Sequence, residues 1–416
     1  MVEFRKHTLS NGLKVIVHRD TTTPMAAVNI LYDVGARDED PDRTGFAHLF
    51  EHLMFEGSVN ILRYDYHLQH AGGENNAFTT NDITNYYLTL PAQNLETAFW
   101  LESDRMLNLA FSEEKLATQK NVVVEEYRQS YLNQPYGDAW LMLRPLAYTE
   151  HPYRWATIGQ CIDHIYHANL ADVKSFFKRF YHPANAILTV AGHVDPDHVF
   201  KLAEKWFGEI DAGQGNIRDL PREPSQKEER RQVVERDVPQ DQIFMAFHMC
   251  ARTHPDFFAT DLLSDILANG DSARLPAKLV HEQKLFSEVN AYLTGNIDPG
   301  LFVITGKPHS HVDARQAEEI LWREALTMAN EAIGVRELQK VKNKIEATQT
   351  FSESNVLAKA MNLSYHELLG DAAMINKQTD AYFSVDASHI KRVAADLFAL
   401  RNVSVLHYVK KDQPGL

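Results

Sequence analysis

Residues 211–232 have no apolar periodicity, and this interruption constrains the fold more than any other feature of the sequence. The segment is rich in Gly, Pro, Gln, Arg and Glu, a composition typical of a linker. The 416-residue chain is also longer than a single hydrophobic core usually supports. We therefore expect two domains, residues 1–212 and 232–416, joined by a linker at residues 213–231.

The first part begins with strand patterns and ends with one. Alternating apolar residues predict strands at residues 13–17 and 26–34, and we expect the chain to open with these strands paired. Helical spacing follows at residues 45–55. The remaining predicted elements are a helix at 61–71, a strand at 86–90, helices at 95–109, 113–132 and 170–180, and a strand at 186–191.

The second part repeats this order of elements with little residue identity. Its predicted elements are strands at 233–238 and 243–249, a helix at 257–267, a strand at 300–305, helices at 314–330, 335–351 and 388–397, and a strand at 403–409. Both parts therefore end with a helix followed by an apolar strand. This repeat predicts two similar domains.

Composition excludes several classes of protein. The chain has 42 Lys and Arg against 56 Asp and Glu, a formal charge of −14, and no basic run that would follow a phosphate backbone, so nucleic acid is not an expected partner. No apolar stretch approaches the roughly 20 residues of a membrane helix. Two distant cysteines, Cys161 and Cys250, favour a reduced compartment. The first 20 residues alternate like a strand, which predicts a cytoplasmic protein, or a periplasmic one if a leader has been removed.

Residues 48–52 carry the chemistry that the sequence predicts. His48 and His52 are four residues apart and so share one face of a helix, with Glu51 just before the second histidine. Imidazole nitrogens are good zinc ligands, and a catalytic zinc needs a third protein ligand and one open position for water. Glu51 would accept a proton from that water. Taken alone, the motif also fits a histidine pair on a solvent-facing helix.

The sequence His48-Leu49-Phe50-Glu51-His52 is the inverted form of the HExxH zinc motif, and it resembles the family of pitrilysin, insulin-degrading enzyme and mitochondrial processing peptidase. In that family the third ligand is a glutamate in a later helix, in a segment like ERxVVxEE. Residues 119–126 read QKNVVVEE, so the resemblance implies Glu126 as the ligand. Glu125 is the alternative, because adjacent helical positions point about 100° apart and cannot share this role.

Residues 72–79, GGENNAFT, resemble the GGxxNAxT segment of the same family. The resemblance implies an edge strand to which the substrate backbone is added as a further strand, with Asn76, Ala77, Phe78 and Thr79 as substrate-binding residues. Such β-augmentation gives affinity through main-chain hydrogen bonds and needs little sequence preference. The alternative is a plain glycine-rich turn before a strand.

The chain departs from the family pattern at two places. Gln119 stands where the family often has a second glutamate that supports the metal site, and we expect its amide still to form a hydrogen bond. In the second half, self-sufficient members have a segment like LREKxGLAYSV, whose Arg and Tyr clamp the substrate. The matching stretch has Val280 and Ser287 at these positions, so the clamp is absent.

The resemblance therefore implies an α+β fold of two similar domains, each a mainly antiparallel β-sheet packed with α-helices. It also implies a zinc endopeptidase subunit with one Zn²⁺ per chain, acting on short or unfolded peptides in an enclosed chamber. Because the clamp is missing, we expect a heterodimer with a homologous partner subunit that supplies the Arg and Tyr. The alternatives are a self-sufficient homodimeric peptidase and a non-catalytic scaffold subunit.

Other histidines and motifs have simpler interpretations. His67 and His70 are three residues apart on a predicted helix, and we expect them to pack or lie at the surface. His309 and His311 are expected in a loop with no chemical role. Residues 133–140, 151–153 and 158–159 also resemble family landmarks, and a structural role is expected for all three stretches.

Overall fold

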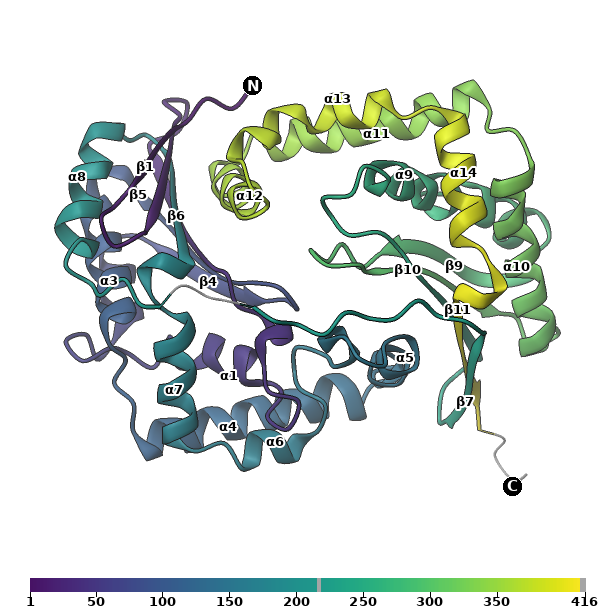
Figure 1. The fold of residues 1–416 in the computed structure, drawn as a ribbon, viewed down its shortest axis with the longest axis horizontal. Helices are drawn as coiled ribbons and strands as arrows, with labels where there is room; N and C mark the ends of the chain where they lie inside the picture. Colours follow the sequence, from purple (N-terminus) through teal and green to yellow (C-terminus); the bar gives the residue numbers. More distant parts are fainter. Residues whose placement is uncertain (215–217, 412–416) are drawn as a thin grey trace. The chain divides into compact units, whose positions relative to one another are not determined.

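The computed structural model describes residues 1–214 and 218–411. They form two compact units, each built around one β-sheet (Figure 1). Unit 1 consists of Met1–Tyr127, Trp155–Leu220 and Gln349–Lys377, and unit 2 of Arg128–Arg154, Pro221–Thr348 and Gln378–Leu416. The units are therefore interleaved along the chain, which differs from the continuous ranges expected from the linker.

The sheet of unit 1 has six strands in the order β1-β2-β6-β3-β5-β4. Their bounds are β1 (Arg5–Thr8), β2 (Lys14–Arg19), β3 (Met25–Tyr32), β4 (Glu74–Thr79), β5 (Thr84–Pro91) and β6 (Ala186–Gly192). All neighbouring pairs are antiparallel except β2 and β6. The edges of this sheet in the described structure are β1 and β4, and β4 contains the residues predicted to bind substrate.

The expectation that the first two predicted strands pair with each other is wrong. Strand β6, which is some 160 residues further along the chain, lies between β2 and β3, parallel to β2 and antiparallel to β3. Every residue of β6 is buried, as is typical of a central strand with both faces covered. Instead, β2 takes β1 as its hairpin partner.

The sheet of unit 2 repeats this topology in the order β7-β11-β8-β10-β9. Its strands are β7 (Arg230–Arg236), β8 (Gln242–His248), β9 (Phe286–Leu293), β10 (Leu301–Pro308) and β11 (Val403–Lys410). The pair β7 and β11 is parallel, as β2 and β6 are, and the other pairs are antiparallel. The α+β fold with two similar domains is thus confirmed, and the residue boundaries of the repeat stay a prediction.

Helices cover the sheets of both units. Unit 1 contains α1 (Phe46–Leu53), α2 (Tyr64–His70), α3 (Leu95–Leu107), α4 (Glu113–Tyr127), α6 (Ile162–Tyr166), α7 (Leu170–Phe180), α8 (Pro196–Phe207) and α12 (Val356–Leu368). The other helices are α5 (Ala139–Ala147), α9 (Phe257–Ala268), α10 (Ala314–Asn330), α11 (Val335–Ser352), α13 (Gln378–Ser384) and α14 (Ala387–Leu397). None of the helices in residues 1–214 and 218–411 combines the length and apolar character needed to cross a bilayer.

Two helices explain why the units are interleaved. Helix α12 comes from the second half of the chain but packs on the sheet of unit 1, where Ala360 meets Ala27 of β3 and Ala191 of β6. These small residues allow the helix to approach the sheet closely. Helix α5 comes from the first half and packs on the sheet of unit 2, with Leu143 in one apolar cluster with residues of β7, β8 and β11.

A buried polar network fixes the position of α12 on its sheet. The Nδ2 of Asn29 donates to the Oγ of Ser364 at 2.9 Å, and that hydroxyl donates to the Oγ1 of Thr189 at 2.8 Å. All three residues are fully buried. Because buried polar groups are costly when they lack a partner, this network favours one register of α12 over others.

Candidate metal centre and active site

Helix α1 carries two of the predicted ligands, and its start is held by the side chain of Glu39. The helix has only eight residues, and such short helices are marginal without tertiary support. It begins after Gly45, whose φ of 89° lies in the left-handed region that favours glycine. The buried Glu39 accepts the backbone N–H of Gly45 at 2.9 Å and that of Ala47 at 2.8 Å, which satisfies donors that the first turn leaves open.

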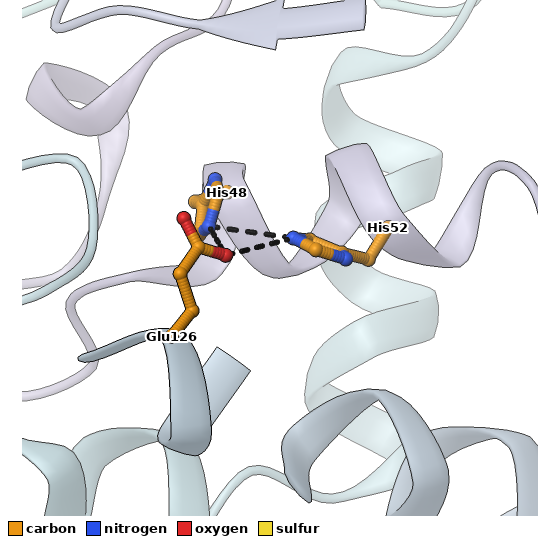
Figure 2. Close-up of side chains that lie close together, drawn as sticks. All are labelled: His48, His52 and Glu126. Atoms are coloured by element: carbon orange, nitrogen blue, oxygen red, sulfur yellow. Dashed lines mark hydrogen bonds and ion pairs between the residues drawn. The ribbon is translucent and has the colours of Figure 1, made fainter. Parts of the chain in front are cut away.

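The predicted ligands His48, His52 and Glu126 meet at one point (Figure 2). The Oε2 of Glu126, on α4, lies 3.0 Å from the Nε2 of His48 and 3.4 Å from the Nε2 of His52. The two Nε2 atoms are 3.4 Å apart. Glu125 is exposed on α4, so the structure brings Glu126 rather than its neighbour to the two histidines.

The donor set fits a zinc ion. Two imidazole nitrogens and one carboxylate oxygen are the ligands of a catalytic zinc site, which keeps a further position open. All three side chains are partly exposed, so water has access to them. Among the described residues, these three side chains form the group of His, Cys, Asp or Glu residues whose ligand atoms lie close enough together to hold one metal ion.

The charges of the site are strongly coupled. Burial lowers the pKa of His48, but its hydrogen bonds to Glu126 and Glu51 outweigh burial and raise that pKa to about 9. Hydrogen bonds to His48 and His52 hold the pKa of Glu126 far below its usual range.

Glu51, the predicted base, lies beside the ligands with its carboxylate held by two groups. The hydroxyl of Thr79 donates to the Oε2 of Glu51 at 2.7 Å, and the Nδ1 of His48 lies 3.4 Å from the same oxygen. Burial raises the pKa of Glu51, but these two contacts outweigh it and the pKa is lowered overall. The carboxylate is thus favoured in its ionised form, as a general base requires.

Strand β4 is an edge strand, as the resemblance predicted. It pairs with β5 alone among the described residues, and its side chains alternate between exposed and half-buried. Asn76 and Phe78 lie on the exposed face, whereas Ala77 and Thr79 are on the half-buried one. The backbone N–H of Ala77 donates to the side-chain oxygen of Asn76 at 2.8 Å, so Asn76 occupies a donor that an added strand would use.

The three positions that depart from the family pattern each contact neighbouring residues. The amide of Gln119 donates to the carboxylate of Glu56, just beyond α1, so the expected hydrogen bond is made. Val280 packs at the margin of the apolar core of unit 2. The hydroxyl of Ser287 accepts from the side-chain amide of Gln240 at 2.7 Å.

The other histidines considered in the sequence are outside the candidate ligand group found among the described residues. His67 packs edge to face against Trp100, and the Nδ1 of His70 bonds to the carbonyl of Tyr66. His309 and His311 lie in the turn after β10, with their rings stacked. Between the landmarks at residues 151–153 and 158–159, Trp155 donates its indole N–H to the carbonyl of Ala36 at 2.8 Å, a contact within unit 1.

Two functional contacts were not foreseen in the sequence. The hydrogen bond between Thr79 and Glu51 joins β4 to the predicted base, whereas the family resemblance implied a role in substrate binding only for Thr79. The cap that Glu39 provides to α1 was not predicted either. A Glu six residues before a helix-starting glycine is a weak signal, because an intervening loop has to fold back for the contact to form.

Comparisons with known proteins agree with this architecture. Residues 14–149 match the model of the insulinase family (peptidase family M16), and residues 167–345 match the peptidase M16 inactive domain. The zinc protease PqqE of Helicobacter pylori is 33% identical over 343 residues, 80% of this chain and 77% of that protein. The mitochondrial-processing peptidase subunit beta of Caenorhabditis elegans is 26% identical over 272 residues, 64% of this chain and 58% of that protein.

Solved structures show the same fold. The crystal structure of a protease from Helicobacter pylori superposes with a TM-score of 0.92 at 27% identity, covering 99% of this chain and 100% of that chain. The periplasmic protease PqqL from Escherichia coli superposes with a TM-score of 0.80 at 17% identity, over 98% of this chain and 48% of that chain. From its sequence and its fold, the chain belongs to the insulinase family of peptidases, peptidase family M16.

Proposed function

We propose that this chain is the zinc-bearing subunit of an endopeptidase that hydrolyses short or unfolded polypeptides. The observation that carries the proposal is the convergence of His48, His52 and Glu126 beside the carboxylate of Glu51. The relatives named as zinc proteases support the same chemistry. We propose one zinc ion per chain.

The catalytic roles follow from the positions of the side chains. A zinc ion held by the two histidines and Glu126 would supply Lewis acidity to activate water and to stabilise the oxyanion of the transition state. Glu51 accepts a proton from the attacking water and later delivers it to the amine that leaves. Thr79 and His48 hold Oε2 of Glu51, which leaves Oε1 as the oxygen that exchanges the proton.

The substrate binds as an added strand on the free edge of β4. Its main chain would replace the side chain of Asn76 at the N–H of Ala77, and Asn76 would turn to the substrate backbone. Only an extended segment can pair in this way, so folded domains are poor substrates. The exposed Phe78 lies on the opposite face of the strand from Thr79 and contacts alternate substrate side chains.

The substrate clamp has to come from a second chain. Val280 and Ser287 have neither the charge nor the phenol needed to hold a substrate, and both already have neighbours within unit 2. We propose a heterodimer in which a homologous partner supplies an Arg and a Tyr. A relative named as a subunit of mitochondrial-processing peptidase supports such an assembly.

Activity and metal analysis test the proposal together. We expect the purified chain to bind one zinc ion, to lose it in His52→Ala, and to cleave unfolded polypeptides only when the partner is added. Glu51→Gln should retain zinc but reduce cleavage by the pair to a small residual rate. Robust cleavage by a clean homodimer would support the self-sufficient alternative, and a chain that binds no zinc would support the scaffold.

The compartment remains a prediction. We propose a cytoplasmic location. A periplasmic location is the alternative, and the similarity in fold to the periplasmic protease PqqL keeps it open. Fractionation of cells that express the full gene distinguishes the two locations.

A further inference from the structure

We propose that Thr79 is a positioning residue for the catalytic base and does not bind the substrate through its hydroxyl. The inference rests on the proposed function, since it assigns Glu51 as the base. Its basis is the hydrogen bond of 2.7 Å from the Thr79 hydroxyl to the Oε2 of Glu51. This bond links the last residue of β4 to α1, the helix that carries the predicted zinc ligands.

The local geometry makes Thr79 a rigid support. Its β-branched side chain has few accessible rotamers, so the position of the hydroxyl follows directly from the backbone of β4. That backbone is fixed by the pairing of Thr79 with Thr84 on β5. The Glu51 side chain has three rotatable bonds. If no neighbour held it, fixing its conformation would cost conformational entropy in each catalytic cycle. Thr79 pre-organises it before substrate arrives.

The contact also couples substrate binding to the base. Ala77, two residues before Thr79 and on the same face of β4, presents its N–H to the free edge where a substrate strand would pair. Pairing on that edge restrains β4, and the restraint extends to Thr79 at the end of the strand. A correctly paired substrate therefore meets a base whose carboxylate is already oriented.

Direct substrate binding by Thr79 makes a different prediction. If its hydroxyl bonded to the peptide, removing it would weaken substrate affinity and raise KM. If it orients Glu51, removing it lowers kcat and leaves KM and zinc content unchanged. Thr79→Val removes the hydroxyl and keeps the branched shape, whereas Thr79→Ser keeps the hydroxyl.

The chain offers a matched control at the other end of the same strand pair. The hydroxyl of Thr89 on β5 donates to the carboxylate of Glu74 on β4 at 3.2 Å, and Glu74 pairs with Thr89 as Thr79 pairs with Thr84. Thr89→Val therefore removes a threonine-carboxylate hydrogen bond from the same two strands without touching Glu51. A general loss of strand stability would affect both variants equally.

The test measures kcat and KM for an unfolded polypeptide with the full chain and its partner. We expect Thr79→Val to lower kcat at least about tenfold with KM unchanged, Thr79→Ser to restore most of it, and Thr89→Val to match the wild type. In a Glu51→Gln background, Thr79→Val should reduce the residual rate no further, because its effect passes through Glu51. A raised KM, an additive effect with Glu51→Gln, or an equal loss in Thr89→Val would overturn the proposal.

A structural measurement keeps this inference separate from the proposed function. In crystals of Thr79→Val, the Glu51 carboxylate should leave its wild-type position, and in Thr79→Ser it should keep it. An unmoved carboxylate in Thr79→Val contradicts the positioning role even when the enzyme is active. Conversely, a wild-type chain that binds no zinc and cleaves nothing contradicts the proposed function, whatever the Glu51 side chain does.

Discussion

The Oε1 of Glu39 accepts the backbone N–H of Ala47 at 2.8 Å, one residue before the first predicted zinc ligand. Glu39→Gln replaces one acceptor with a donor and should loosen the start of α1. We expect zinc to bind about 10-fold more weakly, because partners that orient ligands typically contribute 10- to 100-fold to metal affinity. Competition with a chelator of known affinity gives the zinc Kd.

Asp195 provides the control for this prediction. Its side chain caps α8 in the same unit by accepting the N–H of His198 at 2.9 Å. Asp195→Ala should cost about 1 kcal/mol of unfolding free energy, as loss of a helix cap usually does, and leave the zinc Kd unchanged. Equal zinc affinities for Glu39→Gln and the wild type would show that the cap plays no part in holding the ligands.

Glu125 and Glu126 are adjacent on α4, and substituting each of them tests which one is the zinc ligand. Glu126→Gln should reduce zinc binding to well below one ion per chain, because the amide is a poor ligand and the carboxylate at the two histidines is lost. Glu125→Gln makes the same chemical change at the neighbouring, exposed position of the helix. This variant should keep the full zinc content. Metal analysis after dialysis measures both, and the reverse result would assign the ligand to Glu125.

The buried network under α12 should contribute measurably to stability. Ser364→Ala leaves the amide of Asn29 without its acceptor, and the expected loss is about 1 to 3 kcal/mol of unfolding free energy. Ser354→Ala removes an exposed hydroxyl that lies just before α12 and should change stability by less than about 0.5 kcal/mol. Urea denaturation of the two variants gives the comparison, and similar values for both would contradict it.

A buried ion cluster in unit 2 makes stability depend on acid pH. Burial raises the pKa of Glu318, but hydrogen bonds to His407 and Arg231 outweigh burial and lower that pKa to about 2. Because the pKa is lower in the folded chain than in the unfolded chain, the stabilisation is present above about pH 4.3 and is lost as the pH falls toward 2.

The measurement is the unfolding free energy between pH 7 and 2. Glu318→Gln should be less stable than the wild type at pH 7 and should lose less stability as the pH falls. Glu319→Gln, at the next and exposed position of α10, should follow the wild-type curve. Parallel curves for the wild type and Glu318→Gln would exclude Glu318 as a source of the acid sensitivity.

Much of the fold can be predicted from local patterns in the sequence, but its long-range pairing cannot. Apolar periodicity predicts α1, α4 and β11 within a few residues, because the period records which face is buried. The same pattern does not say which surface the face meets. The parallel pairing of β2 with β6, and the packing of α12 on the sheet of unit 1, depend on contacts between distant segments.

In the candidate site, too, local sequence patterns predict some residues and not others. The spacing of His48 and His52 predicts a shared helix face, because four residues make about one turn. Choosing Glu126 over Glu125 needed the family resemblance, and the geometry agrees with that choice. The role of Thr79 toward Glu51 had no signal in the sequence, since a hydroxyl at the end of an edge strand fits substrate binding equally well.

Because α12 lies late in the chain but packs on the sheet of unit 1, that sheet is translated well before the helix that covers it. Chains emerge from the ribosome with the N-terminal part first, and domains generally fold as units. The sheet of unit 1 is complete once β6 has emerged, yet the helix that covers β3 and β6 begins only at Val356. The nascent chain must therefore keep this apolar surface protected until most of its length has been translated, and a fragment that ends at the linker would leave it uncovered.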